Sequence, residues 1–223
     1  MENISIKNLI DFIRKSEVSK KTFVDNLKKD KQSENVSGGD YWISSLSTIS
    51  NVYKTGESNL LDEKNEILQD KINASDVKTT KTMFQRNIDI LHNFEDYDLV
   101  NIKPDVDFEL HKKPDDKSII NINGLPIEAK PHHVFSFKNG EIKEIGAVWC
   151  IAKLEGFSES ELGMYTDIMW RYLNKHFSND FAVNPYYCNA VDVMNGKEVS
   201  YTQILKGEVP ILLEKTIDEI NAV

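Results

Sequence analysis

The residues from 101 to 153 constrain the fold more than any other stretch, because two hairpin turns divide them into short β-prone runs. Asn123-Gly124 and Asn139-Gly140 form the turns. An Asn-Gly pair favours a two-residue hairpin because a type I′ turn needs positive φ at both central residues. Pro131 cannot donate to a neighbouring strand and is expected to break or bulge the strand that contains it. The stretch predicts an antiparallel β meander with the runs 106–111, 118–122, 125–137 and 141–152.

Apolar residues at helical spacing dominate the chain before this meander. They predict helices at 3–30, at about 40–56 with Asp40 as N-cap, at 59–72, and at a fourth stretch capped by Thr79 or Thr80. The stretch 31–39 is rich in serine and glycine and is interpreted as a linker.

A long helix is predicted after the meander. Ser158 and Glu161 have the spacing of a capping box and would open a helix over 159–177. A strand at 186–194, a turn at Asn195-Gly196, a strand at 198–203 and a short helix at 209–220 follow. The pattern predicts an α/β or α+β fold, with a helical N-terminal part, an antiparallel meander packed by a long helix, and a further hairpin.

Length and element order suggest three parts. These are an N-terminal helical segment (1–35), a helical region (36–95) and a mixed sheet and helix core (96–223). The formal net charge of −9 opposes broad, nonspecific attraction to nucleic acid, but it allows a local basic groove or carboxylates that hold cations. It suits a protein partner equally well.

The chain is expected to be cytoplasmic and not to enter a membrane. It has no apolar run near the roughly 18 residues of a membrane span. Its first residues lack the pattern of a secretory signal. Cys150 and Cys188 lie in apolar, β-prone contexts that favour buried free thiols in a reducing compartment.

Four charged residues around the first hairpin are the candidate chemical site. Asp105 and Asp107 lie at the start of the first predicted strand, 106–111, and Glu128 and Lys130 lie near Pro131. Alternate side chains of a strand share a face, so each pair would point one way. If the strands pair, the carboxylates would converge as hard oxygen ligands for Mg²⁺, with the ammonium group beside a metal-bound water.

At these residues the sequence resembles the PD-(D/E)xK nuclease superfamily. The family pattern is a helix, a meander carrying Asp and then Glu-x-Lys, a helix and a final strand, which here covers about residues 80–195. The resemblance implies that Asp105 or Asp107, together with Glu128, would bind Mg²⁺. It also implies that the carbonyl of Ala129 would assist and that Lys130 would position or activate the attacking water.

The same sequence contains competing patterns. A second Glu-x-Lys occurs at 141–143 and a second Pro-Asp at 114–115, and the run 118–122 interrupts the family's usual hairpin. The charged residues also fit the outer face of a half-solvated sheet. His132 and His133 are adjacent, so in a strand they would face opposite ways and could not readily chelate one ion.

Two functions follow from these observations. The first is a Mg²⁺-dependent nuclease that hydrolyses phosphodiester bonds, for which analogy at the level of the fold suggests bacterial defence or mobile elements. The second is a non-catalytic, acidic protein-binding module, such as an inhibitor, an adaptor or a degenerate nuclease-like domain. The distance between Asp105 or Asp107 and Glu128 discriminates between them, because ligands of one cation must lie within about 4–6 Å.

Overall fold

The computed structural model describes residues 3–29, 41–111 and 118–223, which form an α/β fold, as predicted. The strands are β1 (Ile4–Ser5), β2 (Phe108–His111), β3 (Ile119–Ile122), β4 (Leu125–Glu128), β5 (His133–Asn139), β6 (Ile142–Ile151), β7 (Ala182–Asp192) and β8 (Lys197–Ser200). Within the described residues they form a five-stranded sheet in the order β2-β5-β6-β7-β8 and a three-stranded sheet in the order β1-β4-β3.

The larger sheet is mixed. Strands β2, β5 and β6 are antiparallel neighbours, and β7 and β8 form an antiparallel hairpin. Strand β6 runs parallel to β7, so the chain must cross over between them, and helix α6 (Glu159–Phe177) makes this crossover. The capping box is present, because the Ser158 hydroxyl accepts from the Glu161 N–H and the Glu161 carboxylate accepts from the Ser158 N–H.

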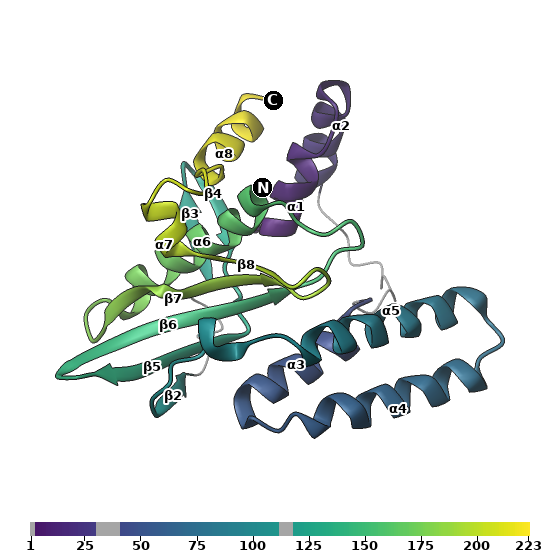
Figure 1. Ribbon diagram of the computed structural model, residues 1–223. Coiled ribbons are helices and arrows are strands. Elements are labelled where there is room, and N and C mark those ends of the chain that lie inside the picture. Colours follow the sequence, from purple (N-terminus) through teal and green to yellow (C-terminus); the bar gives the residue numbers. More distant parts are fainter. Residues whose placement is uncertain (1–2, 30–40, 112–117) are drawn as a thin grey trace.

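Helices cover both faces of the larger sheet (Figure 1). The other helices are α1 (Ile6–Ile13), α2 (Glu17–Lys28), α3 (Ile43–Thr55), α4 (Asn59–Ala74), α5 (Lys78–Glu95), the 3-10 turn η1 (Leu99–Asn101), α7 (Tyr201–Leu205) and α8 (Leu213–Ala222). Helices α3, α4 and α5 share one hydrophobic cluster with one face of the sheet. The remaining α-helices and the small sheet share a second cluster with the other face. The sheet therefore lies between two helical layers.

The first hairpin forms as predicted, but the strand that follows it does not continue. Asn123 and Gly124 have φ of 48° and 82°, as a type I′ turn requires. The predicted run 125–137 is divided around Pro131 into β4 of the small sheet and β5 of the large one. Because Pro131 lacks an N–H, it cannot extend a ladder, and the chain changes sheets there.

Two local predictions in the N-terminal half were wrong. The stretch 3–30 is not purely helical, since Ile4 and Ser5 form β1, which pairs in parallel with β4. Ile4 is only 2% exposed, so burial beside β4 overrides helical spacing there. Helix α5 is capped by Val77 rather than by a threonine. Asp40, the linker 31–39 and the Pro-Asp pair at 114–115 lie outside the described residues.

None of the helices in the described parts of the chain has both the length and the apolar character needed to cross a membrane.

Candidate functional site

The first pair of predicted carboxylates lies at the entrance to β2. Asp105 and Asp107 are exposed, and both line a surface pocket together with Lys54 and Lys103. Asp107 also lines a second pocket, which includes Lys143 near the start of β6. The pair is therefore placed at the end of the sheet where β6 begins.

The second pair belongs to the small sheet. Glu128 ends β4, where it lies between Ser5 of β1 and Ile119 of β3. Lys130 follows it, and its Nζ lies 2.9 Å from Glu128 Oε1. The side chain of Lys130 is 57% exposed and that of Glu128 is 32% exposed, so this is a solvated ion pair. Glu128 and Lys130 thus meet each other, although Lys130 lies beyond the end of β4.

The two pairs lie toward opposite ends of β6. Asp107 shares a pocket with Lys143, whereas Lys130 shares one with Trp149 and with residues beyond it. Lys143 and Trp149 are six positions apart in the strand, which at about 3.3 Å per residue corresponds to roughly 20 Å. The predicted Mg²⁺ ligands Asp105, Asp107 and Glu128 therefore do not form one set. Across residues 3–29, 41–111 and 118–223, no cluster of at least three acidic, histidine or cysteine side chains is suited to a metal ion.

The pocket beside Lys130 has the more distinctive chemistry, and we call it the basic cleft. Its volume is about 580 Å³. One wall comes from α1, the opposite wall comes from α3, α5 and the residues just before α3, and the floor is the end of β6 with the loop that follows. The lining residues are Lys7, Tyr41, Trp42, Leu46, Arg86, Lys130, His132, Trp149, Cys150, Ile151, Ala152, Lys153, Leu154, Glu155, Phe157 and Tyr165.

Positive charge is concentrated in the basic cleft. Its lining includes Lys7, Arg86, Lys130 and Lys153, against the single carboxylate of Glu155. This excess contrasts with the net charge of −9 for the whole chain. Lys7 and Lys130 are exposed, so their ammonium groups are accessible to a bound anion.

Aromatic rings are interleaved with these cations. Tyr41, Trp42 and Trp149 are half-buried, and the rings of Tyr41 and Trp42 meet edge to face at 4.5 Å between centroids. Arg86 lies 5.8 Å from the centroid of the Tyr41 ring and donates a 3.0 Å hydrogen bond to the Tyr41 hydroxyl. On the floor, Trp149 meets Tyr165 edge to face at 5.0 Å. Cations beside partly exposed rings are typical of sites that bind phosphate and a base together.

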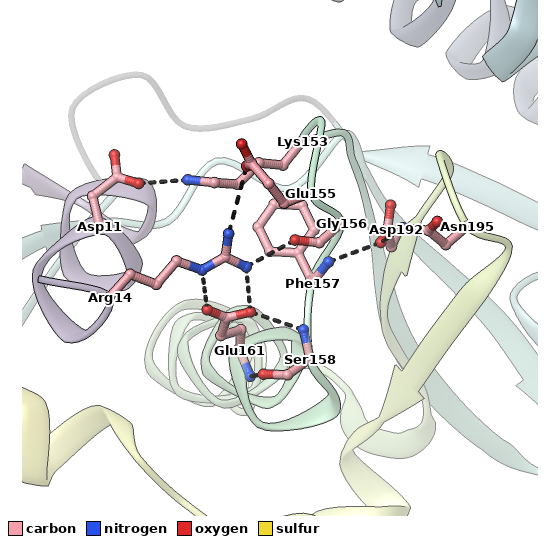
Figure 2. A network of polar contacts seen from close by, with 10 residues as sticks. All are labelled: Asp11, Arg14, Lys153, Glu155, Gly156, Phe157, Ser158, Glu161, Asp192 and Asn195. Carbon is pink, nitrogen blue, oxygen red and sulfur yellow. Dashed lines mark hydrogen bonds and ion pairs between the residues drawn. The ribbon is translucent and has the colours of Figure 1, made fainter.

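A network of polar contacts holds the loop between β6 and α6, which forms part of the floor (Figure 2). Arg14, which caps the C-terminus of α1, donates to both oxygens of Glu161, at 2.5 and 2.6 Å, and to the carbonyl of Gly156 at 2.8 Å. Lys153 of the loop pairs with Asp11 of α1 at 2.5 Å. Burial disfavours the charged form of Glu161, but the hydrogen bonds from Arg14 and Ser158 outweigh it and lower the pKa of this carboxyl.

The far side of the same loop is attached to β7. Asp192 is fully buried, and its carboxylate accepts from the Phe157 N–H at 3.0 Å and from the Asn195 side-chain amide at 2.8 Å. Gly156 has a φ of 65°, and a Cβ there would lie 2.0 Å from the Asn195 amide nitrogen. Position 156 therefore requires glycine, and the loop is fixed from both sides.

The adjacent histidines contact different parts of the protein, although only His133 lies in a strand, at the start of β5. The His132 ring accepts from the Cys150 N–H through Nδ1 at 3.2 Å, on the side of the basic cleft. His133 is buried, contacts Ser50 through Nε2 and stacks on Tyr53. They do not converge on one ion. Burial raises the pKa of the Cys150 thiol to about 12, so this cleft residue is not a thiolate nucleophile.

Sequence reasoning named Lys130, His132 and Cys150 separately, but it did not bring them together with the other residues of the cleft. Lys7 looks like an ordinary solvated residue of an amphipathic helix, and Trp149 lies inside an apolar strand. The lining comes from stretches more than a hundred residues apart, and only the tertiary fold brings them together. Comparisons of the chain with protein-family models, with curated proteins and with solved structures gave no match.

Proposed function

We propose that this protein binds nucleic acid in the basic cleft, with Lys7, Arg86 and Lys130 contacting phosphate groups. The observation that carries the proposal is the excess of cations in the lining of a pocket on an acidic protein. Lys130 and Lys153 pair with Glu128 and Asp11, so Lys7 and Arg86 are the lining cations that form no ion pair within the described residues, and a bound anion interacts favourably with both. Of the common biological anions, a nucleic acid also uses the aromatic side chains between the cations.

The proposal concerns local contacts rather than the field of the whole molecule. Lys7 has no ion-pair partner within the described ranges, and the partner of Lys130 is a partly exposed carboxylate that water can solvate when the lysine turns to a ligand. Each phosphate neutralised by a lysine releases condensed counterions, so binding through this cleft depends on salt.

Binding of labelled DNA and RNA oligonucleotides, measured by fluorescence anisotropy over a salt series, tests the proposal. Lys7→Gln combined with Lys130→Gln should weaken binding by at least about tenfold and lower the log–log salt slope by about 1.4 to 1.8, the contribution of two phosphates. Lys138→Gln combined with Lys143→Gln is the matched control, because these exposed lysines lie toward the other end of β6. No binding by the parent protein, or equal losses in both double variants, would contradict the proposal.

A second candidate function is the Mg²⁺-dependent nuclease. The order of elements supports it in part, because α5, the strands β2, β5 and β6, α6 and the parallel strand β7 occur in the order of the PD-(D/E)xK pattern, whereas β3 and β4 of the small sheet lie between β2 and β5 and carry Glu128. The positions of Asp105, Asp107 and Glu128 do not fit one Mg²⁺ ion, so we assign the metal no step. Free, buried Cys150 and Cys188 suit a cytoplasmic protein of either function.

Cleavage assays separate the two candidates. Single- and double-stranded DNA and RNA would be incubated with Mg²⁺, Mn²⁺ or EDTA, using the parent protein and the double variant Glu128→Ala/Lys130→Ala. Metal-dependent cutting that the double variant loses would establish the nuclease. A role in defence or in mobile elements would then be the next hypothesis to test. Binding without cutting would leave the non-catalytic function.

A further inference from the structure

We infer that the basic cleft takes an unpaired nucleic-acid strand, with a base against its aromatic wall, rather than a duplex. The inference rests on the proposed function and specifies its ligand. Three observations lead to it: the size of the cleft, the exposed aromatic surface, and the position of Arg86 beside one of the rings.

The size of the cleft suits a few chemical groups rather than a long rigid helix. Its volume of about 580 Å³ falls within the range of roughly 300–1,000 Å³ that is typical of pockets for small ligands. It lies between helical layers on opposite faces of the sheet, with Lys7 on one side and Arg86 on the other. A flexible strand can place one or two nucleotides between these walls, whereas a duplex keeps its bases stacked inside.

The aromatic side chains of the cleft retain surface for a base. Tyr41, Trp42 and Trp149 are only half-buried although they line a pocket. Two ring pairs of the cleft meet edge to face rather than as parallel stacks. They are Tyr41 with Trp42, and Trp149 with Tyr165. Stacking on such rings requires an unpaired base, because paired bases in a duplex expose only their edges in the grooves.

Trp170 provides an internal contrast. Its ring is stacked on Tyr201 with a centroid separation of 4.3 Å and an angle of 8°, away from the cleft lining. Trp170 of α6 and Tyr201 of α7 therefore already stack on each other within the protein. Trp149, in contrast, lines the basic cleft and meets Tyr165 edge to face.

Arg86 connects the aromatic and the cationic parts of the cleft. Its guanidinium lies 5.8 Å from the Tyr41 ring centroid while Nη1 donates to the Tyr41 hydroxyl. A base next to Tyr41 would have its own phosphate within reach of this cation. The guanidinium has further N–H donors for phosphate oxygens in the same plane.

Binding to three ligands tests the inference: a labelled single strand of about 12 nucleotides, the duplex of the same sequence, and a mononucleotide. The single strand should bind at least about tenfold more tightly than either of the others. Tyr41→Leu and Trp149→Leu should each weaken single-strand binding by about 5- to 150-fold, the range for loss of one base-stacking contact. Trp170→Leu is the matched control and should leave affinity unchanged. Circular dichroism and the unfolding midpoint establish that each variant is folded. Tyr41 lies outside both core clusters, so Tyr41→Leu is the variant that should disturb the core least.

The outcomes distinguish this inference from the proposed function. Equal or tighter binding of the duplex, still weakened by Lys7→Gln/Lys130→Gln, would overturn the single-strand inference and leave nucleic-acid binding intact. A mononucleotide that binds as tightly as the strand would overturn it too, as would single-strand binding that neither aromatic variant affects. No binding of any of these ligands would overturn both.

Discussion

Replacing Arg14 with methionine should destabilise the protein markedly, although the Arg14 side chain is partly exposed. Methionine keeps much of the aliphatic length of the side chain but removes the donors to Glu161 and Gly156. The Glu161 side chain is only 7% exposed, so its carboxylate would be left buried with the Ser158 N–H as its remaining donor at this end of α6. The cost is therefore that of a buried charge whose main partner has been removed.

The magnitude follows from the geometry of the pair. A hydrogen bond to a charged group contributes about 1.5–3 kcal/mol, and loss of a partner from a buried ion pair costs about 3–5 kcal/mol. The Arg14 side chain is 30% exposed, so water already screens part of the interaction. We expect a loss of about 2–4 kcal/mol in the free energy of unfolding. For a protein of this length that corresponds to a decrease in Tm of roughly 4–16 °C.

Glu155→Gln is the matched control, because Glu155 faces the same guanidinium from solvent. Its oxygen lies 3.8 Å from Arg14 Nη1 and its side chain is 69% exposed, so the change should cost no more than about 0.5 kcal/mol. Urea unfolding followed by tryptophan fluorescence measures both variants. Arg14→Met within about 0.5 kcal/mol of the parent, or equal losses in the two variants, would refute the reasoning.

The same pair gives a pH dependence of known sign. The pKa of Glu161 is lowered in the folded protein, so its contribution to stability is present above the pKa of an unfolded glutamate, about 4.3. It is lost as the pH falls through the lower, folded value. The difference in unfolding free energy between the parent and Arg14→Met should therefore be constant near neutrality and shrink below about pH 4.

Other positions give independent tests. Gly146→Ala would place a Cβ 2.5 Å from a backbone carbonyl of β7 and should cost about 1–3 kcal/mol, measured by urea unfolding. Gly140→Ala, at a φ of 61° in open space, should cost only about 1 kcal/mol. Cys150 and Cys188 are fully buried with raised pKa values, so a thiol reagent should label them only as fast as the protein opens. Asp192→Ala would leave loop N–H groups without their acceptor and should lower the unfolding free energy by about 2–3 kcal/mol; an unchanged midpoint would contradict this.

Features that depend on a few neighbouring residues could be predicted from the sequence. Ser158 and Glu161 begin α6 at the predicted residue, and the helix ends at Phe177 as its pattern indicates. Gly56 ends α3 with a left-handed φ of 78°, also as predicted. Caps and turns are determined by the hydrogen bonds and allowed φ of adjacent residues, which a single sequence displays directly.

Features that depend on distant pairing could not be predicted in the same way. The short strand β1 exists because Ile4 fits beside Ile127 of β4, more than a hundred positions away. Pro131 was recognised as a break, but the sequence does not indicate that the chain changes sheets there. That change is what separates Glu128 from Asp107, because Glu128 lies in the small sheet whereas Asp107 directly precedes β2 of the large sheet.

A cleft that binds a polyanion is compatible with a net charge of −9 because the charges are segregated. Exposed carboxylates occur along α4, at Asp62, Glu63, Glu66 and Asp70, whereas the cleft lining is cationic. At physiological salt the Debye length is about 8 Å, so a ligand in the cleft interacts with Lys7 and its neighbours and little with α4.

Lowering the salt to about 0.01 M extends that length to about 30 Å, and the acidic surface then repels the ligand as well. Affinity for a single strand should therefore rise less steeply at low salt than counterion release alone predicts. Neutralising α4 carboxylates to Gln or Asn should restore the steeper slope, whereas a slope unaffected by these changes would contradict a segregated charge distribution.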